Sequence, residues 1–164
     1  MTHNQMQGAH QRSHGHPYLW LAANLVLSLA AMYVLMFTMI DSWGDFRNNI
    51  NMLYMSLTML CPMGVIMLLT MRGMYSNRRA NIALYAGFVF VFIASLAGIR
   101  TQTPVGDMQF IASMIPHHSG AILMCREAQI HDSELKSLCA EISAGQRREI
   151  DQMNAIASRL SGKQ

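Results

Sequence analysis

The chain has 164 residues, of which 52% are hydrophobic and only 13% are charged. Soluble domains carry about 25% charged residues, so this composition excludes an ordinary water-soluble protein and indicates a membrane protein. The formal net charge of +3 comes largely from three arginines in the short segment 72–79. A topological role explains that cluster, so we expect no nucleic-acid partner.

Three uncharged apolar runs follow one another along the chain: Tyr18–Ile40, Met52–Met71 and Asn81–Ile99. Each is close to the roughly 20 residues that cross the hydrocarbon layer as a helix. The first run is longer than the apolar part of a signal peptide, and no clear cleavage site follows it. We therefore expect a polar tail (1–17), a region that crosses a lipid bilayer three times (18–100) and a soluble helical domain (101–164).

The arginines predict the orientation of this region. Segment 72–79 carries three arginines, whereas the loop after the first apolar run has Arg47 against Asp41 and Asp45. Since basic loops stay in the cytoplasm, the N-terminal tail is expected there. The C-terminal domain is then expected on the periplasmic side of a bacterial inner membrane.

Helix signals divide the C-terminal domain into two helices. Thr103-Pro104 followed by Asp107 predicts one helix start, because proline suits a first turn and Thr or Asp can cap it. The segment 131–134 predicts a second start, with Asp132 or Ser133 as the cap. A short turn joins the two helices, so the expected fold is all-α: three transmembrane helices followed by an antiparallel helical hairpin.

Both predicted hairpin helices carry a stripe at heptad-like spacing, and these stripes should form the seam between them. Glu149 lies at the centre of the predicted seam. A carboxylate in a buried seam is costly unless it is paired or binds a cation, so we expect such a partner there. His117 and Met124 lie beside the first stripe. The stripes are Asp107, Ile111, Met114, His118, Ala121 and Cys125 on the first helix, and Leu135, Cys139, Ile142, Gln146, Glu149, Met153, Ile156 and Leu160 on the second.

The runs FIASMIPHHSGAILMCREA and SELKSLCAEISAGQRREIDQM resemble the family catalogued as domain of unknown function three-hundred-five. Its CopM-like members are periplasmic copper-binding proteins with a ferritin-like helical bundle. The resemblance covers about the last third of the chain and implies binding of copper, as Cu(I), or of silver through His and Met. This chain departs from the pattern at Cys125 and Cys139, and it has one hairpin where longer members have two. The matching residues are Asp107, Phe110, Met114, His117, His118, Ala121, Ile122, Met124, Leu135, Gln146, Glu149, Ile150 and Met153.

The adjacent histidines give the strongest chemical signal. Imidazole and thioether ligands together suit copper, and the softer sulfur favours Cu(I). On a straight helix His117 and His118 point about 100° apart, so they serve two sites, or one supports the other. The alternative is a solvated pair beside Pro116. A di-iron site is not expected, because the Glu-x-x-His motif is absent. The candidate metal ligands are Met114, His117, His118, Met124, Cys125, Cys139, Glu149 and Met153.

Cys125 and Cys139 are each seven residues from Asp132, so an antiparallel hairpin places them opposite one another. In the periplasm we expect a disulfide. Under reducing conditions the two sulfurs would instead be thiolate ligands, and two small buried side chains are the third interpretation.

Two further patterns leave alternatives open. The second apolar run carries a methionine stripe, which forms either a conducting path for Cu(I) or, as we favour, a flexible helix-packing face. The polar tail is rich in histidine, which indicates either metal binding or an ordinary polar tail. The stripe comprises Met52, Met55, Met59, Met63, Met67, Met71 and Met74, and the tail histidines are His3, His10, His14 and His16.

Taken together, these patterns predict a membrane-anchored protein that binds Cu(I) or Ag(I) and sequesters it or hands it on. We expect no enzyme, because no nucleophile–base set or phosphate loop is present. The alternative is a structural hairpin that assembles a membrane complex without a metal. A single hairpin is too small for a stable core, and His117 and Met124 flank its seam. We therefore expect a homodimer or higher oligomer that completes a four-helix bundle.

Overall fold

The computed structural model describes residues 17–162, and the histidines of the N-terminal tail lie outside this range. All regular structure in the described part is helical, which confirms the all-α prediction. The long helices are α1 (Pro17–Leu35), α2 (Ile50–Thr70), α3 (Arg78–Thr101), α4 (Asp107–Glu127) and α5 (Ser133–Ser161). Two short 3₁₀ helices, η1 (Met36–Met39) and η2 (Trp43–Asp45), lie between α1 and α2.

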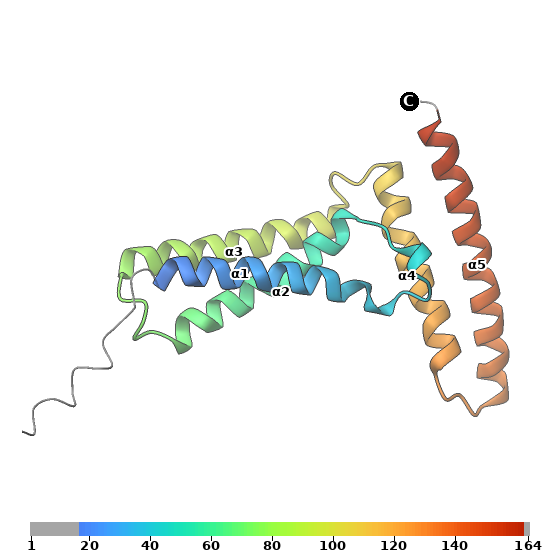
Figure 1. The fold of residues 1–164 in the computed structure, drawn as a ribbon, viewed down its shortest axis with the longest axis horizontal. Helices are drawn as coiled ribbons and strands as arrows, with labels where there is room; N and C mark the ends of the chain where they lie inside the picture. Colours follow the sequence, from blue (N-terminus) through green and yellow to red (C-terminus); the bar gives the residue numbers. More distant parts are fainter. Residues whose placement is uncertain (1–16, 163–164) are drawn as a thin grey trace, which may run out of the picture.

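Helices α1 with η1, α2 and α3 are long and apolar enough to cross a membrane, which confirms the membrane class. They lie side by side (Figure 1). The approach of α2 to α3 depends on two glycines: a Cβ on Gly64 would collide with the ring of Phe88, and one on Gly98 would lie 2.8 Å from the ring of Tyr54. The aromatic rings therefore occupy the space that these glycines leave open.

An apolar cluster closes the end of the bundle that lies away from the hairpin. Leu21, Leu68 and Tyr75 are buried there, and Met67 packs against them. The hydroxyl of Tyr18 donates to Oδ1 of Asn81 at 3.0 Å, which joins the start of α1 to the start of α3. Met67 thus belongs to a packing cluster, which agrees at this one position with the helix-packing interpretation of the methionine stripe.

Helices α4 and α5 form the predicted antiparallel hairpin (Figure 1). Its cap is as expected, because Asp132 accepts a hydrogen bond from the backbone N–H of Leu135 at 2.8 Å. The start of α4 differs from the prediction. Gly106 occupies the cap position without a side-chain bond, and the cis peptide Thr103–Pro104 lies in the preceding turn.

The centre of the seam also differs from the predicted stripe. Ile150 is buried, at 2% exposure, whereas the side chain of Glu149 is 56% exposed. One residue corresponds to a rotation of about 100°, so the isoleucine turns inward and the carboxylate stays in water at the edge, where it costs less. The core of the hairpin consists of Ile111, Ile115, Ile122 and Ile150, with Met153, Ile156, Ala157 and Leu160 packed against it.

The hairpin lies across one end of the membrane bundle, at the end that carries η1 and η2 (Figure 1). The other face of α4 therefore packs against the same chain: a Cβ on Gly120 would lie 3.2 Å from the backbone carbonyl oxygen of Met39. The flank of the seam that led us to expect a second copy is thus partly covered within one chain. Uncovered surface on α4 therefore no longer requires a second copy of the chain, and the homodimer stays a prediction.

Candidate functional site

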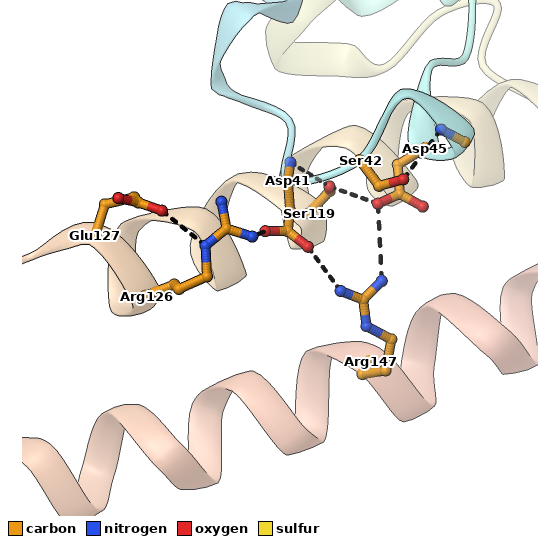
Figure 2. Close-up of polar contacts among 8 residues, drawn as sticks. Asp41, Ser42, Asp45, Ser119, Arg126, Glu127 and Arg147 are labelled. Atoms are coloured by element: carbon orange, nitrogen blue, oxygen red, sulfur yellow. Dashed lines mark hydrogen bonds and ion pairs between the residues drawn. The ribbon is translucent and has the colours of Figure 1, made fainter.

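The hairpin is attached to the bundle by Asp41, whose side chain is only 8% exposed. Arg126 of α4 donates to Oδ1 of this carboxylate, and Nη2 of Arg147 on α5 donates to Oδ2 at 2.8 Å (Figure 2). The hydrogen bond from Arg126 to Glu127, together with the charge of Asp41, raises the pKa of Arg126 above its already high value. Both helices of the hairpin are therefore held by one loop residue.

Ser119 extends this attachment inside the interface. Its hydroxyl donates to Oδ2 of Asp45 at 2.6 Å and accepts from the backbone N–H of Asp41 at 2.8 Å. Ser119 is fully buried and Asp45 is buried, and Arg147 lies 3.9 Å from the same Asp45 oxygen (Figure 2). Buried charged groups need such partners, and paired hydrogen bonds fix orientation. We call Asp41, Asp45, Ser119, Arg126 and Arg147 the docking network.

Two contacts outside the docking network hold the ends of the interface. Arg47 donates to Oδ1 of Asn154 on α5 at 3.2 Å, and the hydroxyl of Tyr54 donates to the carbonyl of Thr103 at 2.7 Å. Sequence reasoning used the loop aspartates and Arg47 only to predict topology. Two acidic residues in a short loop between membrane helices were the one signal of a polar interface.

His118 points into the α4–α5 seam and is 9% exposed. Its Nδ1 lies 3.0 Å from Oε2 of Glu149, close enough for an ion pair if the ring is protonated. The two atoms are not aligned for a hydrogen bond, so the buried Nδ1 of His118 has no hydrogen-bond partner within residues 17–162. The buried Oε1 of Gln146, one turn before Glu149, has none either. Two buried polar atoms without hydrogen-bond partners in the described chain therefore lie in the seam, with one carboxylate at its edge.

Thioether side chains belong to the same seam. Met153 packs against its isoleucine core, one turn after Glu149. Met114 is partly buried one turn before His118, on the same face of α4. In the described part of the chain no three His, Cys, Asp or Glu side chains gather closely enough to hold a metal ion. Besides His118 and Glu149, the seam offers methionine and glutamine side chains as further ligands for a metal.

His117 faces away from the seam, toward the membrane helices. It is exposed, and together with Met124 it lines a cavity of about 700 Å³ between α4, α1, η1 and α2. The rings of His117 and His118 have centroids 6.0 Å apart and are inclined by 63°. The structure therefore separates the two histidines, as one of our alternatives predicted, and it places Met124 with His117.

The two hairpin cysteines form the predicted disulfide, Cys125–Cys139, and Cys61 is free and buried in α2. The bridge joins α4 to α5 next to the turn of the hairpin. In this oxidised form neither sulfur is a thiolate, so the alternative role as metal ligands applies only to the reduced protein.

Comparisons with known proteins extend the resemblance noted in the sequence. A family model described as "Domain of unknown function (DUF305)" matches residues 93–163. The chain is also 31% identical over 118 residues to an uncharacterized protein, L153, of Acanthamoeba polyphaga mimivirus, covering 71% of this chain and 76% of that protein. No solved structure matches.

The docking network leads to a first prediction. Arg147→Met should leave Asp41 with one arginine and weaken the interface, so that the backbone amide of Asp41 exchanges its hydrogen about tenfold faster, since a hydrogen bond to a charged group contributes about 1.5–3 kcal/mol. Hydrogen–deuterium exchange of the protein in detergent measures this. Arg148→Met is the matched control, because Arg148 is the exposed neighbour without an ion pair in the described structure. Equal exchange in both variants would show that Arg147 does not hold the hairpin.

Proposed function

This chain belongs to the DUF305 family, whose description assigns no activity, and we propose that it is a membrane-anchored binding protein for Cu(I) or Ag(I). In this proposal the α4–α5 seam holds the ion, which is the protein's cargo. The protein sequesters the ion or hands it on at the outer face of the membrane.

The observation that carries the proposal is the unpartnered Nδ1 of His118. This buried nitrogen makes no well-directed hydrogen bond although it lies 3.0 Å from a carboxylate oxygen of Glu149, and a bound ion would give it a partner. Beside it stand the carboxylate of Glu149 and the buried amide oxygen of Gln146. A cation placed among these groups would give each of them a partner.

Sulfur ligands give the seam its metal preference. Met114 and Met153 lie one turn from His118 and Glu149, respectively, and thioethers together with an imidazole favour Cu(I) and Ag(I) over harder cations. The negative charge of Glu149 would offset the positive charge of the ion. The Cys125–Cys139 bridge would hold the two helices together without competing for the metal.

The place of the hairpin supports an extracytoplasmic site. It lies at the end of the bundle away from the arginine-rich segment 72–79, which is expected to be cytoplasmic (Figure 1). We propose a bacterial inner membrane with the hairpin on the periplasmic side, where a disulfide is stable. Association into a homodimer also belongs to this proposal, and it would use the surface of α4 that the membrane segments of the same chain leave uncovered.

The metal site leads to a second prediction. His118→Ala should remove one bound Cu(I), and Met114→Leu and Met153→Leu should each weaken that site about tenfold, because leucine conserves volume without sulfur. Cu(I) is supplied as its acetonitrile complex and titrated against a chromogenic chelator, without thiol reductant, so that the disulfide stays closed. His131→Ala is the control, because His131 is exposed in the hairpin turn. Unchanged binding in His118→Ala would favour the structural-hairpin alternative.

The orientation leads to a third prediction. An alkaline phosphatase that is active only in the periplasm should be active when fused after Gln164 and inactive when inserted at Asn77. Expression of both fusions is checked by immunoblot. The opposite pattern would place the hairpin in the cytoplasm and remove the reason for a stable disulfide.

A further inference from the structure

Seven of the 16 methionines of the chain line the cavity between the hairpin and the membrane helices. The cavity lies where α4 crosses the end of the bundle that carries η1, and its volume is about 700 Å³. Its other lining residues are mostly aliphatic. This concentration of sulfur is the feature that apolar packing alone does not require, since leucine would fill the same space.

Separate helical segments bring the sulfur atoms together. On α2, Met52, Met55 and Met59 recur at intervals of three and four residues, so they share one face. The segment of α1 and η1 contributes a second row with the same kind of spacing: Met32, Met36 and Met39. These six side chains converge on one space from two membrane segments that are adjacent in the fold.

Helix α4 closes the cavity and adds a different ligand. His117 and Met124 lie two turns apart on the face opposite the seam, and His117 provides the single imidazole among the lining residues. Gly120 lies between them and allows α4 to approach the backbone of Met39 closely. Docking of the hairpin thus places one imidazole against a surface of thioethers.

The charge of the cavity limits which ion it can hold. No Asp, Glu, Lys or Arg side chain lines it, and the neighbouring Asp41 is already paired with Arg126 and Arg147. Neutral ligands leave the charge of a bound ion uncompensated, so a divalent ion would be far more costly to bury than a monovalent one. Neutral thioethers and an imidazole are ligands for soft ions.

We propose that this cavity is a second metal site, which binds the soft monovalent ions Cu(I) and Ag(I) through thioethers of the membrane segments and the imidazole of His117. It shares no residue with the seam site around His118 and is tested separately from it. The cavity is open at the protein surface, since Met39, Met59 and Met124 are all more than half exposed. The two histidine rings, 6.0 Å apart, are where the two sites come closest.

Counting bound Ag(I) tests the proposal, because Ag(I) needs no reductant and leaves the disulfide intact. Full-length protein in detergent, carrying Cys61→Ala so that no free thiol competes, is titrated with silver nitrate in chloride-free buffer. Excess imidazole competes for silver with histidines that have no thioether partner, including His3, His10, His14 and His16 of the N-terminal tail. The parent should bind two ions, and the triple variant Met52→Leu, Met55→Leu, Met59→Leu should bind one, as should His117→Ala.

A control triple variant at the other end of the same methionine stripe, Met67→Leu, Met71→Leu, Met74→Leu, should still bind two ions, because none of these residues, at the end of α2 or just beyond it, lines the cavity. Circular dichroism and gel filtration verify that every variant is folded. Two ions in the cavity variants would overturn the proposal and leave the cavity as an apolar space, for example for a lipid acyl chain. A single ion in the parent that is lost in His118→Ala would overturn it as well, whereas one lost only in the cavity variants would overturn the seam site instead.

Discussion

The carboxylate of Asp41 lies between Arg126 of α4 and Arg147 of α5, and its side chain is 8% exposed. An acidic group at this depth is stable only with close partners, so it fixes the position of both helices at once. Ser119 reinforces the arrangement by bonding to Asp45 and to the backbone of Asp41. The hairpin is therefore held in one orientation on the membrane bundle.

That orientation decides what each face of α4 can do. The face with His118 is turned to α5, where the histidine has a carboxylate neighbour but no hydrogen-bond partner for Nδ1 in the described chain. The face with His117 is turned to the methionines of the membrane segments. Without the docking network, the methionine cavity would lose its α4 wall, whereas the seam, closed by the disulfide, belongs to the hairpin alone. The two proposed sites thus depend on the interface to different degrees.

Local patterns were sufficient to predict the helices, the hairpin and the disulfide. Apolar length predicts the membrane helices, and the equal distances of Cys125 and Cys139 from Asp132 predict their pairing. The burial of Ile150 in the seam in place of Glu149 was not predictable, because the two positions are adjacent and tertiary packing decides which of them turns inward. The docking network was missed for a different reason: Asp41 meets partners 85 and 106 residues away, and no periodicity encodes such contacts. The same holds for the cavity: its methionines form two rows at helical spacing, but nothing in the sequence shows that the two rows face each other.

The central claim is that this protein holds a soft ion with thioether and imidazole ligands. X-ray absorption spectroscopy at the copper edge tests this claim most directly. The wild-type protein in detergent, with its disulfide intact, would be loaded with two equivalents of Cu(I) and freed of unbound metal. The account predicts a first coordination shell that contains both sulfur and nitrogen, with the outer-shell scattering of a histidine ring. A shell of oxygen and nitrogen alone, or the loss of all copper on washing, would contradict it.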